Sequence, residues 1–257
     1  EGEIARDHAA IAELGERLKN ALQQLRDPEE VPGRTGRLLP GKLYRALCLN
    51  DARIFEKQRP GDQSRVSVDL LLDASTSQEE RTELVARQAY ILAESLSALK
   101  LPVRVWGYLS MSGYTVLTRY RDYEEHEKNE EIFRYFTAGA NRDGLAYRAV
   151  GELMAEYPSE RKILIVLSDV TPNDMVKFLY QGQEQAYAGE AAIENAAKEV
   201  RTVCASGVTA LCVYTGDDAG LPAVQRVFGQ NFVKINSLTR FAAAAGRLLE
   251  LALSNPA

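Results

Sequence analysis

Residues 66 to 80 read VSVDLLLDASTSQEE, and this stretch decides the fold class. Seven mostly apolar residues end at Asp73, and hydroxyl side chains follow at Ser75 and Ser77. A nearly continuous apolar run of this length predicts a strand that is buried on both faces, as in parallel sheets. Two interpretations of its polar end stay open. Asp73 could make a turn while Ser75 or Ser77 caps a helix, or the three side chains could hold a hard cation.

An alternation of apolar strands and helices continues beyond this strand. Strands are predicted at 66–72, 103–109, 114–120, 162–168, 208–214 and 231–235, and helices at about 80–99, 143–156, 190–206, 221–228 and 238–253. The pattern predicts an α/β fold, a doubly wound, mostly parallel six-stranded sheet with helices on both faces. Only residues 110–113 separate the second strand from the third, which is too short for a crossover helix. The third strand is therefore expected to be an antiparallel edge strand.

The first quarter of the chain has a different organisation. Apolar residues at helical spacing predict a helix over 4–26, and three prolines and three glycines mark 27–42 as a linker. A second short helix is expected at 41–57. We therefore expect an N-terminal helical extension and linker over 1–62 and one domain over 63–257. Since the first residue is Glu1, we also expect the chain to be part of a longer protein.

Composition excludes several classes of function. The 257 residues carry a net charge of −5, which argues against nucleic acid as the main partner. No apolar run approaches the roughly 18 residues of a membrane span. Three cysteines without CxxC spacing are typical of a reducing compartment, so a cytoplasmic location is expected. No GxGxxG follows the first strand, and no P-loop or GxSxG motif occurs. His8 and His126 stand in charged surroundings and are expected to be solvated.

Three polar segments should meet at the carboxyl ends of the strands, where sheets of this type bind ligands. They are DASTS (73–77), TAGANRDG (137–144) and SDVTPND (168–174). Asp73 and Asp169 each follow an apolar strand, so both carboxylates should lie on one rim. Carboxylate and hydroxyl oxygens suit Mg²⁺, with Mn²⁺ or Ca²⁺ as alternatives. Because two of the ligands would be neutral hydroxyls, the cation would still attract an external carboxylate.

The DxSxS motif at Asp73, Ser75 and Ser77, with the later Asp169, resembles the metal-ion-dependent adhesion site of the von Willebrand factor A (VWA) domain. The resemblance covers roughly residues 63 to 253. Five segments resemble the branch that contains nitric-oxide-reductase activation proteins and cobaltochelatase-like subunits. They are GRTGRLLPGKLYRALCLNDARIFEK, NRDGLAYRAVGEL, LIVLSDVTPND, FLYQG and VFGQNFVKI.

The resemblance implies a non-enzymatic protein-interaction domain that binds a partner's Asp or Glu through Mg²⁺. In that branch the domain works with a MoxR-type AAA+ ATPase, which remodels a metalloenzyme or inserts its metal. The chain departs from the family pattern at three positions. Asp143 stands where a threonine ligand is usual, with Asn141 as an alternative ligand. Val170 replaces a common glycine, and Gln78 replaces a common methionine.

Two other functions stay open at this point. The first is a metal-dependent hydrolase or phosphatase that uses the same acidic rim, and the second is a VWA domain with a vestigial, metal-free site. Two further segments are also considered. Residues 120–131 (YRDYEEHEKNEE) are expected to be a solvated loop or helix start, or else an acidic recognition patch beside the metal face. Residues 179–190 are expected to form a loop at the rim.

Overall fold

The computed structural model describes residues 2–25, 30–33, 37–38, 40–49, 55–58, 66–235 and 237–254. They belong to two compact units, one of Glu1–Ala21 with Ser64–Ala257 and one of Leu22–Gln63. The first unit is built on a six-stranded sheet with the strand order β11-β10-β7-β4-β5-β6. Its strands are β4 (Val66–Asp73), β5 (Val103–Met111), β6 (Tyr114–Arg121), β7 (Arg161–Ser168), β10 (Val208–Tyr214) and β11 (Phe232–Lys234).

The sheet confirms the predicted fold class. All of its neighbouring strands are parallel except β5 and β6, which form the expected antiparallel edge. From β4 the chain passes to β5 on one side, and it later returns to β7 on the other side of β4. The strand order therefore reverses between β4 and β7. Ligands of doubly wound sheets bind outside the carboxyl ends of the strands at such a point.

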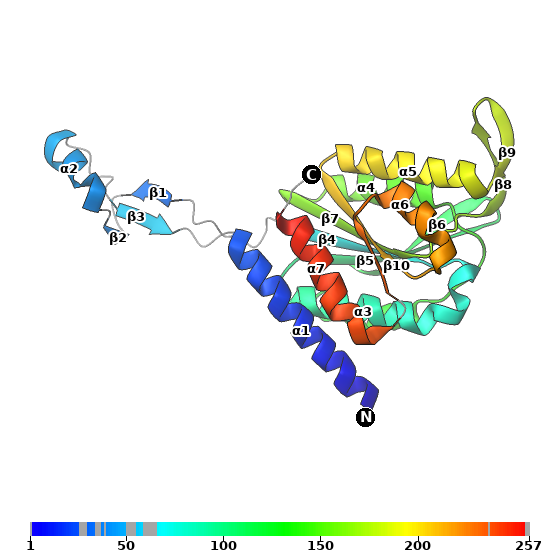
Figure 1. The fold of residues 1–257 in the computed structure, drawn as a ribbon, viewed down its shortest axis with the longest axis horizontal. Coiled ribbons are helices and arrows are strands. Elements are labelled where there is room, and N and C mark those ends of the chain that lie inside the picture. Colours follow the sequence, from blue (N-terminus) through cyan, green and yellow to red (C-terminus); the bar gives the residue numbers. More distant parts are fainter. Residues whose placement is uncertain are drawn as a thin grey trace. The chain divides into compact units, whose positions relative to one another are not determined.

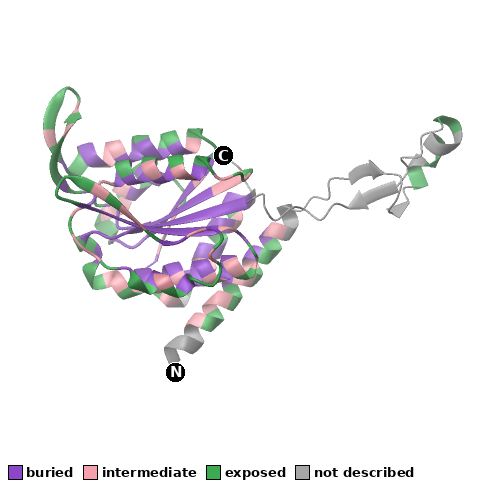
Figure 2. Cartoon of the chain, turned by 180° about the vertical axis from the view of Figure 1, so that it is seen from behind, coloured by how far each residue is buried: buried purple, intermediate pink, exposed green. Residues whose placement is uncertain are grey.

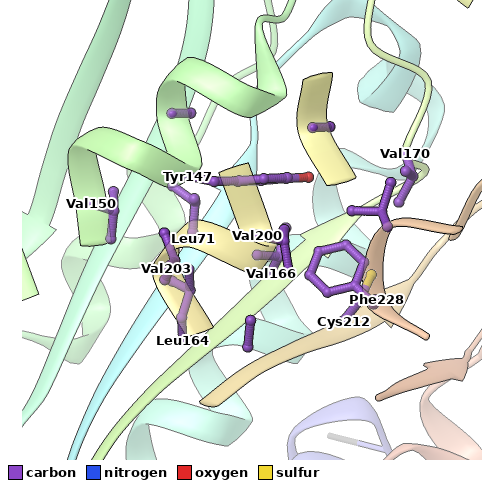
Figure 3. Packing of buried hydrophobic residues seen from close by; sticks show 14 of the residues in the cluster. Leu71, Tyr147, Val150, Leu164, Val166, Val170, Val200, Val203, Cys212 and Phe228 are labelled. Carbon is purple, nitrogen blue, oxygen red and sulfur yellow. The ribbon is translucent and has the colours of Figure 1, made fainter. Parts of the chain in front are cut away.

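Helices cover both faces of the sheet (Figure 1). One face carries α4 (Asp143–Ala155), α5 (Gly189–Ala205) and α6 (Leu221–Phe228), and the other carries α3 (Thr82–Ala98) and α7 (Phe241–Ser254). The strands between them are mostly buried, as Figure 2 shows. Figure 3 shows part of the core beneath α4, α5 and α6, where Tyr147, Val200 and Phe228 meet side chains of the strands. Burial on both faces explains the unbroken apolar runs of these strands.

Helix α1 (Gly2–Leu25) forms close to the predicted 4–26, and its residues through Ala21 are part of the first unit. Leu14 and Leu18 are buried. Asp7 pairs with Arg87 of α3 at 2.9 Å, and Ser95 donates a hydrogen bond to the Ile11 carbonyl at 3.2 Å. These two leucines of α1 are thus covered within the first unit. The limits predicted for the two parts, 1–62 and 63–257, stay a prediction.

The second unit corrects the short helix predicted at 41–57. Helix α2 covers only Leu43–Leu49, after a 3-10 turn at Pro40–Lys42, and Phe55–Gln58 is strand β3. This strand pairs antiparallel with β1 (Glu30–Gly33) and β2 (Arg37–Leu38), both inside the predicted linker. The prediction was wrong because the partners of β3 lie 17 to 28 residues earlier in the chain, from Leu38↔Phe55 to Glu30↔Gln58, and a local sequence pattern does not reveal such pairing.

The loop predicted at 179–190 is mostly a β-hairpin. Strands β8 (Asp174–Tyr180) and β9 (Gln183–Tyr187) pair antiparallel, and the hairpin stands out beyond the end of α5 (Figure 1). Gln181 and Gly182 form its two-residue turn with φ of 50° and 81°. Two positive φ angles characterise the turn type whose twist matches paired strands. The Gln-Gly pair was the sequence signal for this hairpin.

Most of the acidic segment 120–131 forms the expected solvated loop and helix start, with Glu124 and Glu127 exposed in turns. Strand β6 runs through Arg121, and Asn129–Arg134 form a 3-10 helix. Arg121 is fully buried and donates to Ser97 and Asn129 at 2.8 and 2.7 Å. Arg121 pairs with Val105 near the start of β5, whereas Asp73 lies at the carboxyl end of β4. The acidic residues after Arg121 therefore begin at the amino ends of the parallel strands, away from Asp73. The segment then leads to Tyr135, whose hydroxyl donates to the Asp73 carbonyl, and the acidic patch beside the metal face stays a prediction.

Candidate metal centre

Asp73 ends strand β4 and is fully buried. Its Oδ1 accepts a hydrogen bond from the Ser75 backbone N–H at 3.0 Å, and its Oδ2 accepts one from the Ser168 hydroxyl at 2.7 Å. Burial, and then the nearby charge of Asp169, raises the pKa of Asp73 from 3.8 to about 6. The carboxylate is therefore ionised at neutral pH, but it is held close to another negative charge.

The two serines of the motif lie together at the start of a 3-10 helix, Thr76–Arg81. Their hydroxyl oxygens are 3.0 Å apart, with Ser75 buried and Ser77 exposed. Ser75 is the N-cap residue, but its side chain makes no capping hydrogen bond. The Asp73 carboxylate does make the turn, as one interpretation of the sequence held. Helix capping does not explain the hydroxyls, which leaves both available as ligands.

Asp143 is fully buried at the first residue of α4, with its carboxylate turned to side chains and not to the helix backbone. It accepts hydrogen bonds from Asn141 Nδ2 at 2.8 Å, Tyr108 at 3.0 Å and Tyr147 at 3.3 Å. The N-cap residue is Arg142. Burial, and then the charge of Asp73, raises the pKa of Asp143 well above its usual range. Asn141 Nδ2 also lies 3.5 Å from Asp73 Oδ2, so it links the two carboxylates.

Asp169 follows β7 and is almost fully buried. Its Oδ1 accepts hydrogen bonds from the Thr171 hydroxyl and backbone N–H at 2.5 and 3.2 Å. The next residue, Val170, has a φ of +52°, a left-handed conformation that a β-branched residue rarely adopts. Glycine adopts this conformation freely, which accounts for the glycine common at this position in the family that the sequence resembles. The Val170 side chain is buried in the core, as Figure 3 shows.

The loops that carry these residues are held together by backbone hydrogen bonds. Ala138 N–H donates to the Ala74 carbonyl at 2.8 Å, and Thr76 N–H donates to the Gly139 carbonyl at 3.1 Å. Gly139 has a φ of +64°, and a Cβ there would lie 2.5 Å from the Ser110 carbonyl oxygen. Position 139 therefore needs glycine, because segment 137–144 passes close to the backbone of β5 there. The three predicted polar segments therefore meet at the rim.

The donor set can be tested against a divalent cation. Among the described residues, no Arg or Lys forms an ion pair with Asp73, Asp143 or Asp169. Within these described residues, no three Asp, Glu, His or Cys side chains form a group that could hold a metal ion without other ligands. A cation would therefore need the hydroxyls of Ser75 and Ser77 and water as further ligands. Mg²⁺ usually keeps several waters, so these residues fit it.

Several supporting residues were not predicted from the sequence. The Ser168 hydroxyl donates to Asp73 and accepts from the Val170 N–H at 2.9 Å, so it joins the ends of β4 and β7. Burial, and then the Asp143 charge, raises the pKa of Tyr108 well above its usual range, which keeps this phenol a hydrogen-bond donor. The position of Ser168, directly before Asp169, was a possible signal for its role. No local signal pointed to Tyr108.

Comparisons with known proteins agree with this architecture. No protein-family model matches the chain. YojO, an uncharacterized protein of Bacillus subtilis (strain 168), is 25% identical over 199 residues, which make up 72% of this chain and 31% of YojO. The vWF domain of the pilus tip protein Mfa5 from Porphyromonas gingivalis has a TM-score of 0.55 at 12% identity, covering 76% of this chain and 98% of that domain.

The pilus adhesin SpaC from Lactobacillus rhamnosus GG also has a TM-score of 0.55, at 15% identity, over 77% of this chain and 31% of SpaC. The chain thus spans about a third of the length of YojO and of SpaC. Among the described residues, no helix is both long enough and apolar enough to cross a membrane. The likeness to solved structures concerns the fold, and the chain has a VWA-like fold.

Proposed function

We propose that the chain is a protein-interaction domain that binds its partner through a divalent cation at the rim of the sheet. Asp73, Ser75, Ser77 and Asp169 would hold the cation, with Asp143 as a fifth member, and Mg²⁺ is the expected ion. When bound, it supplies a positive charge with a coordination position that a partner's Asp or Glu can fill.

One observation carries the proposal. Three buried carboxylates gather where the strand order reverses, without a cationic partner among the described residues. Buried negative charges are costly unless they are paired or bind a metal. Besides burial, the charge of Asp169 raises the pKa of Asp73 and the charge of Asp73 raises the pKa of Asp143, as expected for carboxylates that crowd into one site. Ser168, Asn141 and Tyr108 then orient the carboxylates through hydrogen bonds.

The wider role that we propose is that of an adaptor for a MoxR-type AAA+ ATPase, acting in the cytoplasm on a metalloenzyme target. Its support is the resemblance of segments such as LIVLSDVTPND and VFGQNFVKI to nitric-oxide-reductase activation proteins. A non-enzymatic role is part of the proposal. His126 follows β6 at the opposite edge of the sheet and faces Arg121, so it is not placed to act as a base at the rim. Mixing the chain with the ATPase in Mg²⁺ and in EDTA tests the partnership.

Calorimetric titration with Mg²⁺ and Mn²⁺ tests the metal centre. Wild type should bind one ion, Asp73→Ala should bind none, and the control Asp122→Ala, at a partly exposed aspartate paired with Arg119, should bind like wild type. Negligible heat from wild type would contradict the proposal and favour a vestigial site. A phosphatase and ATPase screen of the Mn²⁺-loaded protein tests the absence of hydrolytic activity, and turnover that Asp73→Ala abolishes would assign an enzyme.

A further inference from the structure

A pocket of about 630 Å³ opens beside the candidate metal centre. This volume is in the range of pockets that bind drug-sized ligands. Three polar residues of the metal rim, Ser75, Ser77 and Asn141, contribute to its lining. Much of the remaining lining is apolar and comes from the loop after β7, the start of β8, and helices α5 and α6. Its apolar members include Val170, Pro172, Met175, Ala188, Ile193 and Ala223.

The electrostatic character of the pocket favours a negative group with an apolar neighbour. No charged side chain is among the residues that line it. Gly189, the first residue of α5, and Gly220, which precedes α6, both line the pocket. Ala188, the N-cap residue of α5, makes no side-chain capping bond, whereas the Asp217 carboxylate accepts hydrogen bonds from the Ala219 and Gly220 N–H groups before α6. Helix N-termini carry partial positive charge, so the start of α5 adds to the attraction of the cation for a carboxylate.

Large apolar side chains are exposed at the pocket and on the hairpin that begins there. Met175 at the start of the β8–β9 hairpin is 91% exposed, and Leu179 further along is 71% exposed. The turn between β5 and β6 lies beside the same hairpin, because a Cβ on Gly113 would be 3.7 Å from the Val176 side chain. Tyr114, the first residue of β6 after that turn, is 74% exposed. Apolar groups gathered in this way are typical of protein interaction sites.

We propose that this pocket receives a large aliphatic or aromatic side chain of the partner, next to the partner's metal-bound carboxylate. The occupant is an extended protein segment in which an Asp or Glu stands within three residues of an apolar side chain such as Leu. The inference rests on the proposed function, since the carboxylate is held by the cation. The pocket then selects those acidic segments that carry a nearby apolar side chain, whereas the metal alone would bind any accessible Asp or Glu.

Synthetic peptides test the inference on the full 257-residue chain. Each is a twelve-residue Gly/Ser peptide with one Asp and with one Leu placed one, two or three positions to either side. A reference peptide has Ser in place of Leu, and a second reference has Asn in place of Asp. In Mg²⁺ the best Leu peptide should bind about ten-fold more tightly than the Ser reference, because a leucine side chain is buried. EDTA or the Asn reference should abolish binding.

Two variants locate the binding. Ala223→Phe fills the pocket from α6 and should lower the affinity for the Leu peptide about ten-fold, without changing the affinity for Mn²⁺. Ala186→Phe adds the same side chain at an exposed position of β9 outside the pocket lining and should change nothing. Met175→Ser removes an exposed wall residue that folding does not need, and it should weaken the Leu peptide about three-fold.

The outcomes separate this inference from the proposed function. Leu and Ser peptides that bind equally in Mg²⁺ would overturn the pocket assignment and leave the metal-dependent function standing. Leu peptides that bind equally in EDTA would also overturn it, since the pocket would then act without the cation. Dimerisation of the chain that Ala223→Phe abolishes would assign the pocket to a second copy and overturn it too. Absence of Mn²⁺ binding by wild type would remove the proposed function and this inference together.

Discussion

The ionised Asp73 carboxylate should destabilise the metal-free protein at neutral pH. Asp73→Asn should restore the lost free energy of unfolding. Burial and the charge of Asp169 raise the pKa of Asp73 from 3.8 to about 6. A difference of roughly two pKa units corresponds to about 3 kcal/mol. Asparagine keeps the shape of the side chain and has no charge. It weakens the hydrogen bonds from Ser75 and Ser168, at a cost of about 1 kcal/mol.

The sign of the pH dependence follows from the raised pKa. Between pH 4 and pH 6 the unfolded chain has already lost the Asp73 proton, while the native state keeps it. Wild type should therefore lose stability as the pH rises through this window and stay at the lower level above it. In EDTA at pH 7.5, Asp73→Asn should raise the free energy of unfolding by about 1 to 3 kcal/mol. The gain should shrink as the pH falls toward 4.

Urea unfolding, followed by the fluorescence of the single tryptophan, Trp106, measures these free energies. Mg²⁺ at a hundred times its dissociation constant should stabilise wild type by about 2.7 kcal/mol and leave Asp73→Asn unchanged. Asp218→Asn, at an exposed aspartate, is the control and should match wild type. If Asp73→Asn is less stable than wild type in EDTA at both pH 7.5 and pH 5, Asp73 is a well-compensated structural carboxylate and the reasoning fails.

Three further predictions concern other positions. Asp143→Thr removes one negative charge from the rim, so it should weaken Mn²⁺ binding while strengthening the metal-dependent binding of an acidic peptide. Calorimetry checks this, and an unchanged Mn²⁺ affinity would remove Asp143 from the site. At Val170, whose φ is +52°, the Gly variant should be about 1 kcal/mol more stable than the Ala variant in urea unfolding. A more stable Ala variant would show that the left-handed backbone carries no strain. Leu14→Ala on α1 should cost about 2 to 5 kcal/mol, against less than 0.5 kcal/mol for the exposed Asn20→Ala. Equal melting temperatures would mean that the α1 contact contributes nothing to stability.

Much of the fold could be predicted from local patterns. The six strands of the main sheet and the helices between them follow from apolar runs and helical periodicity, which are properties of neighbouring residues. The antiparallel edge followed from chain length, since residues 110–113 leave no room for a crossover. Strand β3 and the β8–β9 hairpin were missed for different reasons. The partners of β3 lie far along the chain, whereas the Gln181-Gly182 turn was a weak signal in a segment without strong alternation.

The candidate site, too, could be predicted only in part from the sequence. The sequence by itself determined that Asp73, Ser75, Ser77 and Asp169 lie at or just after the ends of buried strands, because strand ends and their polar neighbours are local features. Parallel strands then bring those ends to one rim. Only the tertiary structure decided how the carboxylates are held. Tyr108 and Tyr147 reach Asp143 from β5 and α4, and Ser168 joins β7 to Asp73. The pocket beside the rim also depends on the tertiary structure. Residues from five separate segments line it, and its shape cannot be inferred from any one of those segments.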